Sequence, residues 1–216
     1  MFLAHILREL CRIMIICRRS RSPLEIPCLK TEMRKPQKLI AFSKAVHSNE
    51  YDAWVHFYEY DTAFERLWNR PNTYLPILKK FKGVISPDFS VYRDMPLVMQ
   101  QWNIYRSRAI GHWLQENGIP VIPNIRFGDD RTFELSCAGI NKQGVIAVGS
   151  HGCIRILIES KCFISGLKYV VDTLEPKTIV VYGATPDEVF AQYREMGIEI
   201  LQFDSDFMQS RKAVNA

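Results

Sequence analysis

The feature that most constrains the fold is an alternation of short apolar runs with amphipathic segments between residues 51 and 203. The runs are rich in β-branched and aromatic residues, which favours strands, and the intervening apolar residues have helical spacing. Strands separated by helices pair in parallel through right-handed crossovers. We therefore expect an α/β fold with about six mostly parallel strands, at residues 53–60, 84–87, 119–127, 144–150, 178–183 and 198–203. Residues 132–136 are a candidate for an extra strand.

Two architectures fit this alternation, an incomplete (β/α) barrel and a doubly wound sheet. The spacing of strands along the chain does not separate them, and we slightly favour the barrel-like arrangement. In both architectures, ligands bind where the carboxyl ends of the strands meet the loops that follow. The residues at these ends are therefore the first place to look for a site.

Two predicted helices have clear start signals. A helix over residues 96–117 begins with proline at its first position, and the sequence TPDE at residues 185–188 is a capping box for another. The expected apolar face of the longer helix consists of Val98, Trp102, Tyr105, Ala109 and Trp113.

Composition and charge divide the chain into three parts. The 216 residues, 47% of them hydrophobic and 24% charged, fit one globular domain and exclude disordered and repeat architectures. Residues 1–44 contain ten Lys and Arg against three Asp and Glu, a net charge of +7. The remainder has 18 against 20, a net charge of −2. We therefore predict a basic arm over residues 1–44, a single α/β domain over 45–204 and a flexible tail over 205–216.

The first 32 residues have two interpretations. Apolar residues at helical spacing followed by the basic run RRSRS indicate a membrane-surface or targeting helix. The favoured interpretation is an upstream extension of the reading frame, with translation starting at Met33. Charged residues interrupt the stretch, so neither a secretory signal nor a transmembrane segment is predicted. The six cysteines form no CxxC pattern, so zinc is not expected and reduced thiols in the cytoplasm are the default.

Polar residues gather at the predicted strand ends. Asp88 follows Pro87 at a rigid strand end and is the best candidate for an acid, a base or a metal-binding residue, with a helix cap or turn as the alternative. Asn124 and Arg126 alternate along one strand, so they share a face on which a phosphate or carboxylate could bind. The same reasoning adds Ser90 and Tyr182 to the ligand-binding candidates.

The sequence GSHG at residues 149–152 follows a buried strand and could present backbone N–H groups to an anion. Ser150 is the binding candidate within it, and His151 is a candidate general base, with a turn histidine as the favoured alternative. The chain has no phosphate-binding GxxxxGK[ST] loop, GxGxxG fingerprint or GxSxG elbow. It identifies no cofactor and no metal site.

The segments ISPDFSVYRDMP, NIYRSRAIGHWLQENGIPVIPNIRFGDD and GVIAVGSHG resemble a bacterial, phage and plasmid family known as a domain of unknown function. The resemblance covers roughly residues 64–203 and implies a cytoplasmic location and an association with mobile elements, but no activity. It adds Arg106 and Arg108, on the longest predicted helix, to the binding candidates, although a solvated helix face also explains both.

Two functions follow. The first is an enzyme or binding domain for a small anionic ligand, such as a nucleotide or sugar phosphate, with Asp88 for proton transfer or metal binding and Asn124, Arg126 and Ser150 for the anion. The alternative is a nucleic-acid-associated accessory protein of plasmid or phage replication that uses the basic arm. Charge asymmetry and the resemblance motivate this alternative.

Overall fold

The computed structural model describes residues 22–150, 157–206 and 208, and His151 lies outside this range. Within it the chain forms seven strands and seven helices. The strands are β1 (Leu39–Ala41), β2 (Trp54–His56), β3 (Gly83–Ile85), β4 (Val121–Ile122), β5 (Val145–Gly149), β6 (Thr178–Tyr182) and β7 (Glu199–Phe203). The helices are α2 (Phe42–Ala45), α3 (Asp61–Asn69), α4 (Pro71–Leu78), α5 (Leu97–Glu116), α6 (Asp130–Cys137), α7 (Leu157–Leu174) and α8 (Asp187–Glu195).

The strands form two parallel sheets in sequence order, β1-β2-β3-β4 and β5-β6-β7. A parallel bridge between Asn124 and Ala147 joins the two sheets, so the order runs from β1 to β7 without a reversal. A doubly wound sheet reverses its strand order, whereas a barrel does not. The α/β prediction is therefore confirmed, and the order matches the incomplete barrel-like alternative. No ladder joins β7 to β1 among the described residues, so the barrel is not closed.

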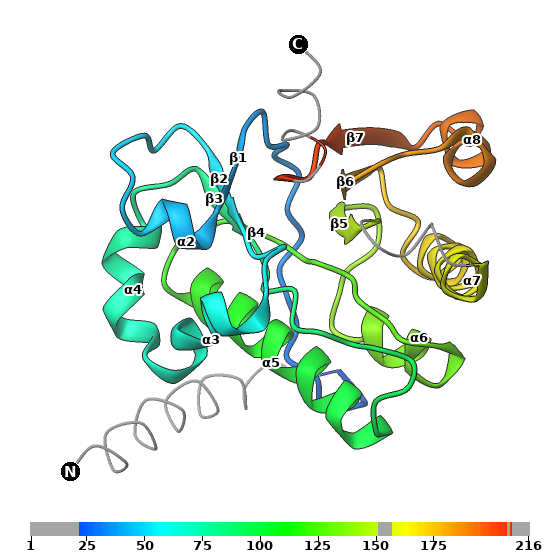
Figure 1. Ribbon diagram of the computed structural model, residues 1–216, viewed down its shortest axis with the longest axis horizontal. Coiled ribbons are helices and arrows are strands. Elements are labelled where there is room, and N and C mark those ends of the chain that lie inside the picture. Colours follow the sequence, from blue (N-terminus) through cyan, green and yellow to red (C-terminus); the bar gives the residue numbers. More distant parts are fainter. Residues whose placement is uncertain (1–21, 151–156, 207, 209–216) are drawn as a thin grey trace.

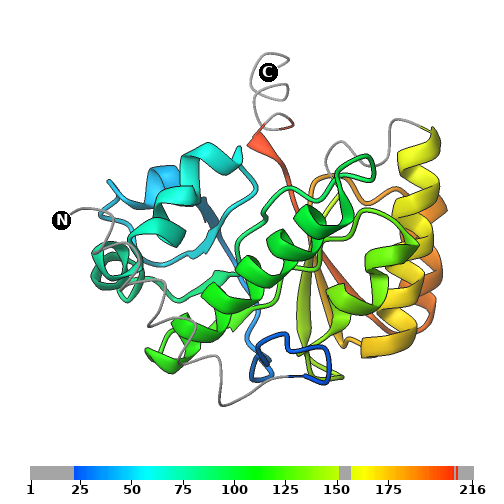
Figure 2. The same cartoon turned by 90° about the horizontal axis from the view of Figure 1, so that it is seen from below.

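Apolar side chains fill both sides of the strands. Successive strand residues point to opposite faces, so half of them point into the barrel-like interior and half toward the helices. The helices lie around the outside, from α4 at the left of Figure 1 through α5 to α8 at the right, and Figure 2 shows the same arrangement from below. The interior cluster consists of Trp54, Ile85, Ile122, Val145, Ala147 and Val180.

Two local predictions differ from the structure. Residues 132–136 belong to α6 and not to a strand, because the Asp129 carboxylate accepts the backbone N–H of Arg131 and caps a helix there. The capping box is wrong, since α8 has Pro186 at its N-cap without a side-chain cap bond. The Thr185 hydroxyl instead donates to Gln202 Oε1 on β7 at 2.5 Å.

The buried face of the longest helix, α5, also differs from the predicted apolar face. Val98 and Trp102 are 70% and 46% exposed, whereas Arg106, Arg108 and His112 are buried. Of the two explanations for Arg106 and Arg108, the solvated helix face is therefore wrong. The sequence pattern correctly placed Ala109 and Trp113 inside, but α5 turns a polar side toward α6 and toward residues 28–30.

The described part of the basic arm contacts the body of the protein. Leu29 is 2% exposed and pairs with Ile140 in a parallel bridge, and Glu32 accepts the N–H of Val145 at 2.9 Å through its backbone oxygen. β1 also lies within this stretch. All five basic residues between 22 and 44 form ion pairs, Lys30 with Glu116, Arg34 with Glu32, Lys35 with Glu199, Lys38 with Glu50 and Lys44 with Asp206.

At the other end of the chain, Ser205 falls within the predicted flexible tail. It is 2% exposed in the structure, and the backbone N–H of Asp206 donates to the Tyr182 hydroxyl at 3.0 Å. Ser205 and Asp206 follow the carboxyl end of β7, which ends at Phe203.

Candidate functional site

A cavity of about 460 Å³ opens at the carboxyl ends of the strands. This volume falls within the ~300–1,000 Å³ typical of small-molecule sites. Its lining comes from the ends of β2, β3, β5 and β6 and from the segments after β4 and β7. The lining residues are Tyr58, Glu59, Tyr60, Ala63, Asp88, Ser90, Tyr92, Arg126, Gly149, Tyr182, Ser205 and Asp206.

The seam between the two sheets positions the central residue, Asn124. Proline has no N–H to donate, and at Pro123 the chain leaves β3 and pairs with β5, where Ala147 donates to the Pro123 oxygen at 2.9 Å. The Asn124 backbone N–H then donates to the Ser86 hydroxyl at 2.8 Å. These bonds place the buried Asn124 between the two sheets, directly behind the cavity.

A hydrogen-bond chain fixes Asp88. The Asn124 amide donates from Nδ2 to Asp88 Oδ1 at 2.7 Å, and its Oδ1 accepts the Tyr58 hydroxyl at 2.9 Å. An amide with its oxygen engaged by a phenol must present its nitrogen to the carboxylate. The other Asp88 oxygen, Oδ2, lies 3.6 Å from Arg126 Nη1. Asp88 is thus held on one side and faces a guanidinium on the other.

Burial controls the chemistry of Asp88. Its side chain is 12% exposed, and burial raises the pKa of the carboxyl above its usual value. The charge of Arg126 and the Asn124 hydrogen bond lower the pKa but do not outweigh burial, and the nearby Asp61 raises it further. A carboxyl whose pKa moves toward neutrality is suited to proton transfer.

An aromatic wall faces this carboxyl. The Tyr58 and Tyr182 rings stack with centroids 4.6 Å apart, and His56 packs beneath them, 4.7 Å from Tyr182. His56 is 3% exposed, and burial lowers its pKa to about 4. Burial also raises the pKa of Tyr58 well above its usual value. At neutral pH the wall is therefore uncharged.

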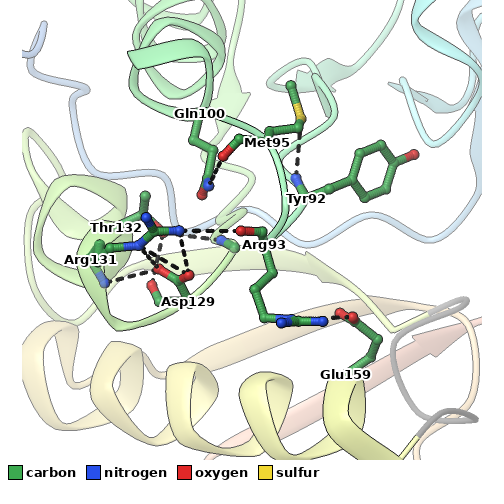
Figure 3. Close-up of polar contacts among 9 residues, drawn as sticks. Tyr92, Arg93, Met95, Gln100, Asp129, Arg131, Thr132 and Glu159 are labelled. Carbon is green, nitrogen blue, oxygen red and sulfur yellow. Dashed lines mark hydrogen bonds and ion pairs between the residues drawn. The ribbon is translucent and has the colours of Figure 1, made fainter. Parts of the chain in front are cut away.

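The loop after β3 forms another side of the cavity. Ser90 donates from its hydroxyl to Asp61 at 2.9 Å, which ties the loop to the first turn of α3. Beyond Ser90 the loop is anchored by side chains of α5 and α6 (Figure 3), where Arg131 donates to the Arg93 backbone oxygen at 3.2 Å and Gln100 to that of Met95 at 2.9 Å. Arg93 itself pairs with Glu159 of α7 at 3.6 Å. Tyr92 at the cavity mouth therefore lies on an anchored loop.

The structure brings most, but not all, of the sequence candidates together. Asp88, Ser90, Arg126 and Tyr182 line the cavity, and Asn124 contacts it through Asp88. The Ser150 hydroxyl donates to the Ala184 oxygen at 2.7 Å, so Ser150 links the end of β5 to the loop after β6. Its neighbour Gly149 lines the cavity instead.

The two arginines of α5 lie behind the cavity. Arg106 bonds Glu65 at 3.1 Å and Asn103 at 2.5 Å, and its guanidinium stacks 3.9 Å from the Phe89 ring centroid. Arg108 bonds the Ser136 backbone oxygen at 2.7 Å. Neither lines the large cavity.

Several lining residues were absent from the sequence candidates. Glu59 is one of the polar residues at the ends of the predicted strands, although no role was assigned to it, and the same strand-end rule applied to its neighbour Tyr58. Glu59 accepts the backbone N–H of Ser43 at 3.0 Å. No sequence signal marked Asp206, because the strand before it was assigned as the last structured element.

The charge of the cavity is mainly acidic. Glu59, Asp88 and Asp206 line it, and Arg126 is the single cation among its described lining residues. Across the described ranges, no three His, Cys, Asp or Glu side chains are grouped so that they could hold a metal ion.

Comparison with known proteins places the chain in a family. Residues 18–204 match the family described as Domain of unknown function (DUF4417). The chain belongs to the DUF4417 family. This match confirms the resemblance seen in the sequence. The match begins at residue 18, whereas the resemblance began at about residue 64.

DUF4417 relatives occur in phages. The chain is 33% identical over 168 residues to the Gene 1 protein of Mycobacterium phage D29, covering 76% of this chain and 62% of the relative. The Gene 1 protein of Mycobacterium phage L5 is also 33% identical over 168 residues, covering 76% of this chain and 73% of the relative. The chain thus spans less than two thirds of the D29 protein. No solved structure matches it. In the part of this DUF4417 chain that the structure describes, no helix has the length and apolarity needed to cross a membrane.

Proposed function

We propose that this DUF4417 protein is an enzyme or binding protein for a small molecule, with its site in the strand-end cavity. The observation that carries the proposal is the position of the Asp88 carboxyl. It is only 12% exposed, accepts a hydrogen bond from Asn124, lies opposite Arg126 and lines a cavity of about 460 Å³. Burying a carboxyl costs free energy even where hydrogen bonds offset part of it, and a buried carboxyl with a raised pKa at a cavity is typical of functional sites. Asp88 is assigned proton transfer, and Arg126 is assigned the anionic group of the ligand.

The lining favours a ligand that has a planar aromatic ring and one anionic group. Tyr60 and Tyr92 are 88% and 54% exposed at the cavity, and stacking of a base on an aromatic ring contributes about 1–3 kcal/mol. Arg126 is the single cation among the described lining residues and already faces Asp88, and Glu59 would repel a ligand with several negative charges. A nucleoside monophosphate therefore fits better than a sugar phosphate, which has no aromatic ring to stack, or a triphosphate.

Binding measurements on the full chain test this proposal. We expect at least one nucleoside monophosphate to raise the melting temperature, and the matched nucleoside and ribose 5-phosphate to do so less. Asp88→Asn keeps the shape of the side chain and should abolish turnover or change ligand affinity. The control is Asp52→Asn, whose carboxylate is 88% exposed and pairs with Lys82 away from the cavity. Equal ligand affinity in the wild type, Asp88→Asn and Arg126→Gln would contradict the assignment.

The alternative is a basic arm that binds nucleic acid. The ion pairs of residues 22–44 limit which part of the arm could supply the positive charge. The five basic residues there already have carboxylate partners, so they release few counterions on binding DNA. The charge would have to come from Arg8, Arg12, Arg18, Arg19 and Arg21, which lie outside the described residues. A salt dependence of DNA binding that persists without residues 1–21 would exclude this version.

A further inference from the structure

Arg108 is a buried cation with incomplete hydrogen bonding. It is 1% exposed, and its guanidinium makes one hydrogen bond, from Nη2 to the Ser136 backbone oxygen at 2.7 Å. Nε and Nη1 have no acceptor among the described residues. Buried polar groups in folded proteins are nearly always hydrogen-bonded, so two such nitrogens on one side chain require an explanation.

The charge of Arg108 has no protein counterpart in the described ranges. Burial lowers the pKa of Arg108 to about 10, so the group remains protonated at neutral pH. Burial raises the pKa of the neighbouring Cys137 thiol to about 12, so this thiol stays neutral and supplies no negative charge. Residues 151–156 contain no Asp or Glu. An unpaired buried charge is strongly destabilising, so a counter-charge is expected nearby.

A small cavity adjoins Arg108. Its volume is about 10 Å³, roughly the space that one water molecule occupies by this measure. Apolar groups of Pro87, Phe89, Val91 and Ile104 form part of the wall, and none of the described residues that line it is acidic. The polar lining consists of Asn103, Ser107, Arg108, Asn124 and Arg126. The amide nitrogens of Asn103 and Asn124 donate to the Ser90 oxygen and to Asp88. The unbonded Nε and Nη1 groups of Arg108 therefore provide the donors for an anion, and their charge repels a cation.

We propose that this cavity binds one monoatomic anion, a halide such as chloride, which accepts hydrogen bonds from Arg108. The volume excludes phosphate and sulfate. A neutral water would satisfy the N–H groups but would leave the charge uncompensated. The anion would connect α5 to the seam residue Asn124, behind the strand-end cavity, and the proposal does not depend on the function proposed for that cavity.

Diffraction with bromide tests the site directly. Crystals of the full chain grown in sodium bromide should show an anomalous bromine peak within hydrogen-bonding distance of Nε or Nη1 of Arg108. A water in that position, an empty cavity, or a protein acceptor bonded to both nitrogens would overturn the proposal. This measurement needs no variant, so it is decisive even if substitution of Arg108 prevents folding.

Thermal unfolding provides the test in solution. Sodium bromide should raise the melting temperature relative to sodium gluconate at the same ionic strength, by about 3 °C for each tenfold increase above the dissociation constant. Arg108→Met should abolish this difference. Arg106→Met, on the same helix but not in the cavity lining, should retain it. An equal bromide effect in both variants would overturn the proposal.

Discussion

The packing of residues 22–32 gives the sharpest prediction, because the sequence alone favoured an incidental extension before Met33. The perturbation is Leu29→Ala. Leu29 is 2% exposed, and its Cδ2 atom would lie 3.2 Å from a Cβ placed on Gly111 of α5. This contact shows that the side chain fills the space beside a helical glycine. Truncating a buried leucine leaves a cavity that the rigid helix cannot collapse to fill.

The expected loss for Leu29→Ala is about 2–4 kcal/mol of unfolding free energy, the range of buried leucine truncations. Removing all of residues 1–32 should lower the free energy of unfolding by more than Leu29→Ala does. It also deletes the acceptor of the Val145 N–H and the Cys28 oxygen, which lies 2.6 Å from His112 Nδ1. Each buried group left unpaired adds about 1–3 kcal/mol, so the total approaches the ~5–15 kcal/mol by which a domain is stable.

Urea denaturation followed by tryptophan fluorescence measures both changes. The matched control is Leu24→Ala, a leucine on the same segment that is 43% exposed and should lose less than about 1 kcal/mol. A Met33-start protein is expected to be largely unfolded. If it unfolds at the same urea concentration as the full chain, residues 22–32 contribute nothing to stability and the reasoning from their contacts is refuted.

Three further predictions concern the barrel-like interior and its upper end. Tyr58→Phe removes the donor to Asn124 Oδ1 and should cost about 1 kcal/mol of stability and weaken ligand binding, as measured by calorimetry; unchanged values would show that the chain to Asp88 is dispensable. Gly83→Ala places a Cβ 2.4 Å from the Trp54 ring and should destabilise by about 1–3 kcal/mol in urea titrations, whereas a neutral effect would mean that the ring moves freely. His56 has a folded pKa of about 4, below the ordinary 6.5, so the unfolded chain takes up its proton first as the pH falls. The stability from neutral His56 is therefore complete above pH 6.5 and is lost between pH 6.5 and 4, by up to about 3 kcal/mol; a His56→Gln variant with the same pH profile would contradict this.

The sequence predicted the architecture well because the signals for it are local. The apolar runs that became β2, β3, β5, β6 and β7 are rich in β-branched and aromatic side chains, which favour strands wherever they are placed. β1 was missed, since three residues inside a basic stretch carry no such signal. Asp88 and Arg126 were found because parallel strands bring their carboxyl ends together in any α/β fold.

The tertiary structure alone decided which polar groups meet and which helix face is buried. Tyr58 stacks on Tyr182 although 124 positions separate them. Their strands, β2 and β6, are not neighbours in the strand order, so the barrel-like curvature of the fold brings their ends together. Arg108 is buried while Val98 on the same helix is exposed, because α6 and residues 28–30 pack against one part of α5 only. Local propensity depends on neighbours in sequence and can be deduced from it, whereas burial depends on partners that folding brings from distant positions.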